Sequence, residues 1–205
     1  MVSRWSVGVA GLLLVPVLLT GLAACSSNDP KAEPSAKATP LGKLHLSSLR
    51  LARAEFCDQV PKSAVRRALG ADPSSDASWG NGDPVDGEDG TGDIGHEIGC
   101  SWNSTQAAAR AWVFARPVTS AFAADLVRQP DHGVGCTTTP TTDFGSPSVL
   151  QSCRSPRGVL ELRRAGLFGD TWVTCEVSNV STPRARLDAF CAQVVAALDA
   201  SGGSG

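Results

Sequence analysis

The sequence predicts an α+β fold in which about three helices pack on an antiparallel β-sheet and disulfides join the parts. Segments with helical and strand periodicity follow one another in the order helix, two strands, helix, four strands, helix. Consecutive strands with short connections pair antiparallel, so the helices must cover the apolar face of the sheet. Six cysteines lie in the same part of the chain and supply the disulfides.

The first half of the domain contains two expected helices and two expected strands. Residues 61–69 have helical spacing, and Gly70 ends that helix. Apolar residues alternate over 98–102 and again over 111–115, which is typical of strands. A second helix begins at Ser120; it pairs Phe122 with Leu126 and Ala123 with Val127, and Pro130 stops it.

Four strands and a helix make up the second half. The strand-like runs are residues 134–138, 149–153, 159–164 and 171–177. The closing helix opens with an N-cap and a proline, Thr182-Pro183. Its apolar positions recur at helical spacing, and they are Leu187, Phe190, Cys191, Val194 and Leu198.

The first 24 residues have the three-part layout of a secretory signal. Arg4 supplies the positive charge, residues 7–20 are apolar, and small residues precede Cys25. The apolar stretch is shorter than the roughly 20 residues that a membrane span needs, and Pro16 interrupts it. We therefore expect a removable signal peptide, residues 1–24.

The segment Leu22-Ala23-Ala24-Cys25 resembles the lipobox of bacterial lipoproteins, in which the cysteine thiol receives a diacylglycerol and becomes the new N-terminus. The alternative is an ordinary signal with a chance cysteine. Lipidation at Cys25 places the protein on the outer face of the cell membrane, with the bilayer as a partner through the anchor. Residues 25–42 then form a flexible tether, 43–200 a globular domain and 201–205 a disordered tail.

Seven cysteines occur, and six are left after Cys25. An even number in an exported chain indicates three disulfides rather than free or metal-bound thiols. Fifteen connectivities are possible, and the sequence alone does not choose among them. The local pattern favours Cys175 with Cys191 between a strand and the last helix, and Cys136 with Cys153 between two strands. Cys57 with Cys100 is what remains.

Short motifs give the domain a family resemblance. They are Cys57-Asp58-Gln59-Val60 before a helix that ends in Leu69-Gly70, Cys100-Ser101-Trp102, and a closing helix after a cysteine-bearing strand. In these the chain resembles a family of small actinobacterial cell-envelope lipoproteins built around one domain of unknown function. The resemblance implies a location and a fold over residues 45–200, and it supplies no catalytic residues.

No catalytic or cofactor motif is found in the sequence. The three histidines, His45, His96 and His132, are far apart, and the usual hydrolase, metalloprotease and phosphate-loop patterns are missing. One of the 18 basic residues, Arg4, lies in the signal, so 17 remain against 20 acidic ones, a balance that indicates no nucleic-acid partner. We expect a non-enzymatic protein without a cofactor.

Residues 72–97 carry eight acidic side chains and no lysine or arginine. Such a segment is either a solvated mobile loop or, since Ca²⁺ binds oxygen ligands in irregular geometry, a weak calcium site. The weak calcium candidates are Asp83, Asp86, Glu88, Asp89 and Asp93. Trp79 is unexpected in this polar segment and is a candidate ligand contact, although a tryptophan that pins a loop to the core is the commoner case.

Four arginines, Arg154, Arg157, Arg163 and Arg164, lie close together in sequence. Alternation along the strand puts Arg164 on the inward face and Arg163 on the outward one, so we expect a solvated edge rather than an anion site. The sequence as a whole predicts a non-catalytic envelope lipoprotein that binds an unidentified ligand or protein partner. The alternatives are an accessory or structural subunit of an envelope enzyme or transporter and, third, a hydrolase.

Overall fold

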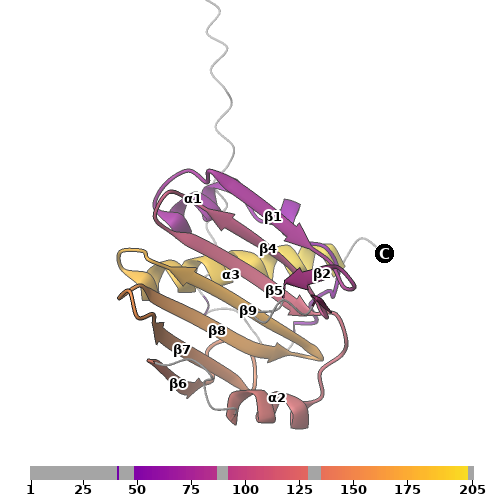
Figure 1. Ribbon diagram of the computed structural model, residues 1–205. Coiled ribbons are helices and arrows are strands. Elements are labelled where there is room, and N and C mark those ends of the chain that lie inside the picture. The colour runs from indigo at the N-terminus through magenta and orange to yellow at the C-terminus, as the bar shows by residue number, and fades with distance from the viewer. Residues whose placement is uncertain (1–40, 42–48, 87–91, 129–134, 203–205) are drawn as a thin grey trace, which may run out of the picture. The chain divides into compact units, whose positions relative to one another are not determined.

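The computed structural model describes residue 41 and residues 49–86, 92–128 and 135–202 (Figure 1). Three helices, α1 (Lys62–Leu69), α2 (Ser120–Arg128) and α3 (Pro183–Gly202), accompany a short 3₁₀ turn, η2 (Cys57–Gln59). The strands are β1 (Ser75–Trp79), β2 (Pro84–Asp86), β3 (Gly92–Ile94), β4 (Glu97–Asn103), β5 (Ala108–Phe114), β6 (Cys136–Thr141), β7 (Ser148–Arg154), β8 (Leu160–Phe168) and β9 (Thr171–Ser178). Within these ranges, no helix has the length and hydropathy of a membrane span.

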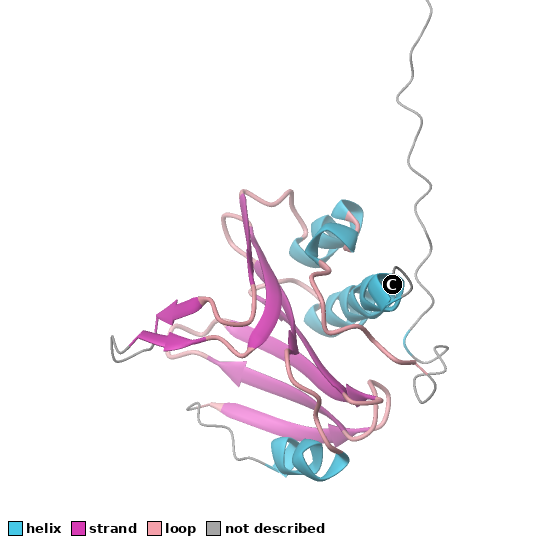
Figure 2. Cartoon of the chain, turned by 90° about the vertical axis from the view of Figure 1, so that its right-hand side faces the viewer, coloured by secondary structure: helices cyan, strands magenta, loops and turns pink. Residues whose placement is uncertain are grey.

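Seven strands form one antiparallel sheet in the order β1-β4-β5-β9-β8-β7-β6. The two remaining strands, β2 and β3, pair with each other as a hairpin. Figure 2 shows α1 and α3 together on one side of the sheet and the hairpin projecting from the other side. The α+β class predicted from the sequence is therefore correct.

The main core lies between the sheet and the pair α1 and α3. Alternate residues of the central strands face the helices, as Cys175 and Val177 of β9 do, and they are fully buried. The expected apolar positions of α3 are buried as well, and the Phe190 ring meets Trp102 edge to face with centroids 5.8 Å apart. Leu41, which the sequence assigned to the tether, is 6% exposed and belongs to this core.

A smaller apolar cluster lies on the other face, which we call the open face. There α2 packs Ala123, Leu126 and Val127 against the sheet, near Leu167 and Trp172. Phe122, expected to pair with Leu126, is instead 45% exposed, because only one side of this two-turn helix reaches the sheet. The helix thus covers one end of the open face.

The acidic segment contains strands that the sequence analysis did not predict. β1 lies within residues 72–97 and pairs along its whole length with β4, while β2 and β3 form the hairpin. The interpretation of the segment as a single solvated loop is therefore wrong. At the other end of the domain, α3 continues to Gly202, two residues into the predicted disordered tail.

Three disulfides join these elements, and their pairing is the one that the local pattern favoured. Cys57–Cys100 ties η2 to β4, Cys136–Cys153 joins directly opposed residues of β6 and β7, and Cys175–Cys191 joins β9 to α3. Their sequence separations of 43, 17 and 16 residues correspond to about 3–4 kcal/mol each in the chain-entropy account.

Candidate functional site

A polar hollow of about 590 Å³ lies where β1 ends, and we call it the Trp79 pocket. Its volume lies within the range of roughly 300–1,000 Å³ typical of small-molecule sites. Trp79 and Ile98 give it an apolar part, and the other side chains of the lining are mostly polar. These are Glu55, Asp58, Gln59, Ser78, Asn81 and Asp83.

Gly99 sets the position of the Trp79 ring. The two residues are cross-strand partners in the β1–β4 register, so they lie on the same face of the sheet. A Cβ placed on Gly99 would stand 2.3 Å from the indole Cζ2 of Trp79 and 2.8 Å from the carbonyl oxygen of Ala111. The half-buried indole therefore rests directly on the Gly99 backbone, and no other residue leaves room for it there.

Two local features shape the rest of the pocket. The Cys57–Cys100 disulfide fixes the segment that carries Glu55 and Asp58 against β4. On the other side, Gly80 to Asp83 form a tight turn, in which the Gly80 amide donates to Oδ2 of Asp83 at 2.6 Å and the Asp83 amide donates to the Gly80 carbonyl at 3.2 Å. The pocket is thus assembled from chain segments about 20 residues apart.

The lining is acidic. Glu55, Asp58 and Asp83 contribute three carboxylates, and the lining contains no lysine, arginine or histidine. An ionised carboxylate only accepts hydrogen bonds, so the pocket presents acceptors to whatever enters it. Within the described ranges, no three acidic, histidine or cysteine side chains are grouped as metal ligands.

The calcium candidates are placed only in part. Asp83 lines the pocket, and its carboxylate already accepts the Gly80 amide. Asp86 and Asp93 lie in β2 and β3, opposite Gly92 and Val85 respectively. Glu88 and Asp89 lie outside the described residues.

Next to the pocket, the open face carries a row of charged residues from neighbouring strands, which we call the charged row. Arg110, Glu176 and Arg163 are register partners on β5, β9 and β8. The Glu176 carboxylate is 3% exposed; it accepts from Arg163 Nη2 at 2.7 Å and from Nε at 3.0 Å, and Arg110 Nη1 lies 3.6 Å away. One buried carboxylate thus holds two arginines in the plane of the face.

Trp112 links the charged row to the Trp79 pocket. It is the register partner of Gly99, so the two tryptophans flank this glycine on the same face. The guanidinium carbon of Arg163 lies 5.3 Å from the Trp112 ring centroid, a cation–π contact. The half-exposed Trp112 is therefore fixed from one side by Arg163.

Two carboxyl groups of the open face are harder to ionise than usual. Burial raises the pKa of Glu97, and Arg163 and a hydrogen bond from Trp112 offset part of this effect. Burial also raises the pKa of Glu161, and the negative charge of Glu176 adds to the rise. The open face therefore carries two carboxyl groups with raised pKa values near the guanidinium of Arg163.

The four neighbouring arginines do not form one site. Arg164, 1% exposed, lies on the helix side and donates to Asp143 at 2.6 and 3.0 Å and to Asp188 at 2.7 Å. Arg163 faces the open side, and Arg154 donates to the Gly158 carbonyl at 2.8 Å. The expected split between the two faces is confirmed, and the buried Arg164 joins β8 to α3.

The remaining candidates are widely spread. His96 is exposed, while His45, His132 and Cys25 lie outside the described residues. Trp102 and Trp172 are buried core residues. The sequence analysis identified Trp79 and, as a calcium candidate, Asp83, but it missed Glu55, Asp58 and the charged row. Strand alternation could have revealed the charged row. Glu176 follows the inward-facing Cys175 and Arg110 precedes the inward-facing Ala111, so both charged side chains must lie on the open face.

No family model, no curated protein and no solved structure matches this chain.

Proposed function

We propose that the chain is a non-catalytic binding domain and that the Trp79 pocket is its ligand site. The observation that supports this most is the pocket itself, whose lining brings together Trp79 and three carboxylates and contains no lysine, arginine or histidine. Trp79 is the register partner of Gly99 on the neighbouring strand, and the missing side chain of Gly99 leaves the indole a defined place on the sheet. Both features fit recognition of a small molecule.

The lining selects the chemistry of the ligand. Ionised carboxylates only accept hydrogen bonds, so a ligand that carries donors such as amines or hydroxyls matches Glu55, Asp58 and Asp83. The Trp79 ring favours a ligand with an apolar or cationic face that can stack on the indole. Amino sugars and amine-bearing peptides of the cell wall combine these properties, and we propose them as the ligand class.

The location of the domain is part of the same proposal. A lipid on Cys25 would hold the mature protein on the outer face of the cell membrane, as in the envelope lipoproteins that its motifs resemble. Two acyl chains contribute about 0.8 kcal/mol per buried CH₂ and give stable anchoring. Replacing Cys25 by Ala should release the protein from the membrane fraction, and a variant that stays there would contradict lipidation.

The ligand site is tested by thermal unfolding of the oxidised protein with peptidoglycan fragments, simple amines, Ca²⁺ and small anions. A ligand at 100 times its Kd adds about 2.7 kcal/mol, which raises the Tm by several degrees in a domain of this size. The matched variants are Asp58→Asn with Asp83→Asn in the pocket, and Asp76→Asn with Asp199→Asn on exposed positions outside it. Each pair removes two negative charges.

We expect amine- and hydroxyl-bearing fragments to raise the Tm of the wild type and of the control pair, but not of the pocket pair. Equal shifts in all three proteins would show that the pocket is not the site. If no compound shifts the Tm and the protein co-purifies with one stoichiometric envelope protein, the accessory-subunit alternative is favoured instead.

A further inference from the structure

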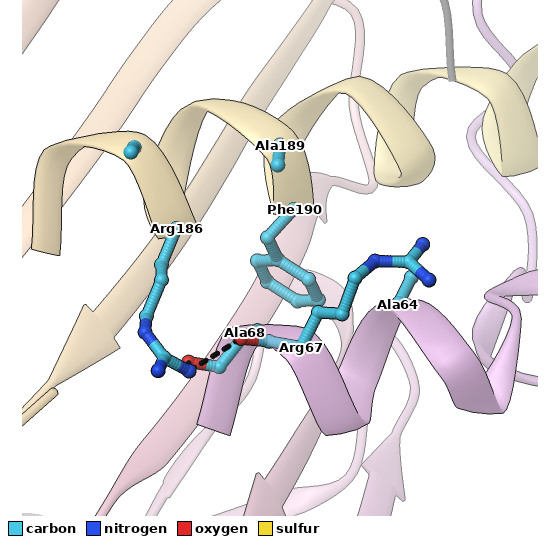
Figure 3. A pocket seen from close by; sticks show the side chains of 7 residues that line it. Ala64, Arg67, Ala68, Arg186, Ala189 and Phe190 are labelled. Carbon is cyan, nitrogen blue, oxygen red and sulfur yellow. Dashed lines mark hydrogen bonds between the residues drawn. The ribbon is translucent and has the colours of Figure 1, made fainter. Parts of the chain in front are cut away.

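A second hollow lies on the helix side of the domain, between α1 and α3, and we call it the α1–α3 groove (Figure 3). Its volume is about 280 Å³. Phe190 and alanines of both helices line its floor, and Arg67 and Arg186 stand on either side of the Phe190 ring. It shares no residue with the Trp79 pocket.

Arg186 is held in place by backbone groups rather than by an acid. Its Nη1 donates to the Arg67 carbonyl at 2.6 Å and its Nη2 donates to the Ser181 hydroxyl at 3.2 Å, so it caps the C-terminus of α1. A Cβ on Gly70 would lie 2.6 Å from this guanidinium, and Gly70 has φ +76°. The absence of a side chain at Gly70 therefore allows both the left-handed backbone that ends α1 and the close approach of the Arg186 guanidinium.

The groove combines an apolar floor with uncompensated positive charge. Among the described residues, neither Arg67 nor Arg186 pairs with a carboxylate, whereas the neighbouring Arg66 pairs with Asp72 and Arg184 with Asp188. The lining itself contains no acidic residue. An occupant that matches it must be apolar along its length and negative at one end.

We propose that the α1–α3 groove binds an anionic phospholipid of the membrane surface, with part of an acyl chain against the exposed Ala185 and Ala189 and the phosphate near Arg67 and Arg186. Lys62, one turn before Arg66 and Arg67 on α1, adds positive charge to the same helix. The opposite charge of the Trp79 pocket excludes such a lipid there. The inference does not depend on that pocket, and it uses the proposed anchor only to bring the membrane near.

The test is hydrogen exchange of the full chain mixed with vesicles, followed peptide by peptide. One set of vesicles is phosphatidylcholine and the other is equal parts of phosphatidylcholine and phosphatidylglycerol. We expect amides of α1 and of the first half of α3 to exchange several-fold more slowly with the anionic vesicles only, and high salt to weaken the effect. This readout is independent of lipidation at Cys25 and of the Trp79 pocket.

Three variants make the test specific. Arg67→Glu reverses an exposed charge at the groove, and Arg157→Glu makes the same change at an exposed position in the β7–β8 turn. Ala189→Phe fills the groove from an exposed position of α3 without altering charge. We expect Arg67→Glu and Ala189→Phe to lose the protection and Arg157→Glu to keep it. The inference is overturned if both vesicle types protect these amides equally, or if inorganic phosphate alone gives the same protection. It is also overturned if all three variants keep the protection of the wild type.

Discussion

Substituting Gly99 by Ala is expected to displace the Trp79 ring and to destabilise the domain. The new Cβ would stand 2.3 Å and 2.6 Å from two indole carbons and 2.8 Å from the Ala111 carbonyl oxygen. An indole can move away, but the backbone oxygen belongs to the adjacent strand of the sheet, so part of the strain stays. Overpacking of this kind costs about 1–3 kcal/mol.

Urea unfolding without reductant measures this cost as a shift of the midpoint at constant slope. In thermal unfolding, each kcal/mol corresponds to about 2–4 °C for a domain of this size. Gly80→Ala is the matched control, since its Cβ would meet only the Asp83 carboxylate at an ordinary 3.7 Å. Tryptophan fluorescence should change with Gly99→Ala alone. If Gly99→Ala keeps both the stability and the fluorescence of the wild type, the indole does not rest on Gly99.

Three further outcomes follow from the structure. The hydrogen bond from Arg164 lowers the pKa of Asp143 below its ordinary 3.8. The ionised Asp143 therefore stabilises the folded state above pH 3.8, and this stability is lost as the pH falls through the folded pKa. Asp143→Asn should flatten the acid side of a plot of the urea midpoint against pH. Mild reduction followed by alkylation and mass spectrometry should label the partly exposed Cys136 and Cys153 first, because each of the other disulfides has a buried sulfur. Glu176→Gln should lower the free energy of unfolding by about 1–3 kcal/mol, measured in urea, since a charge-assisted bond becomes a neutral one.

The cysteine-bearing elements were the part of the fold most readable from the sequence. In β9 the residues alternate, and in α3 the apolar residues recur every three or four positions, so Cys175 and Cys191 both had to face the core. When two core-facing cysteines lie on consecutive elements, a disulfide between them can be predicted from the local sequence pattern alone. The pairing of Cys57 with Cys100 followed only because the other four cysteines were assigned.

β1 was missed because its residues do not have the composition of a strand. Ser75 to Trp79 contain serine, aspartate and alanine, which are poor strand formers, and the strand has little buried surface. Its regular structure comes from backbone pairing with β4, a long-range contact that local propensity does not encode. Phe122 shows the opposite error, since its helical spacing was real but the sheet reaches only the Ala123 side of α2.

Two residues of the candidate site, Trp79 and Asp83, could be identified from the sequence. Trp79 was identified because an aromatic residue is out of place among acidic and glycine residues. Glu55 and Asp58 carry no such signal, and they reach the pocket because the Cys57–Cys100 disulfide and the β1–β4 pairing bring two distant segments together. Sites assembled in this way need the tertiary structure before their members can be named.

The charged row on the open face is not explained by stability alone. A buried ion pair seldom contributes more than well-packed apolar residues of the same volume, because the desolvation of the carboxylate opposes the attraction. Here the carboxylate of Glu176 is almost fully buried, yet both arginines remain partly exposed and one of them contacts Trp112. The arrangement therefore fixes the position of exposed groups beside the Trp79 pocket. Replacing Glu176 by Met should then disturb the contact of Arg163 with Trp112, seen in near-UV circular dichroism, even where the loss of stability is small.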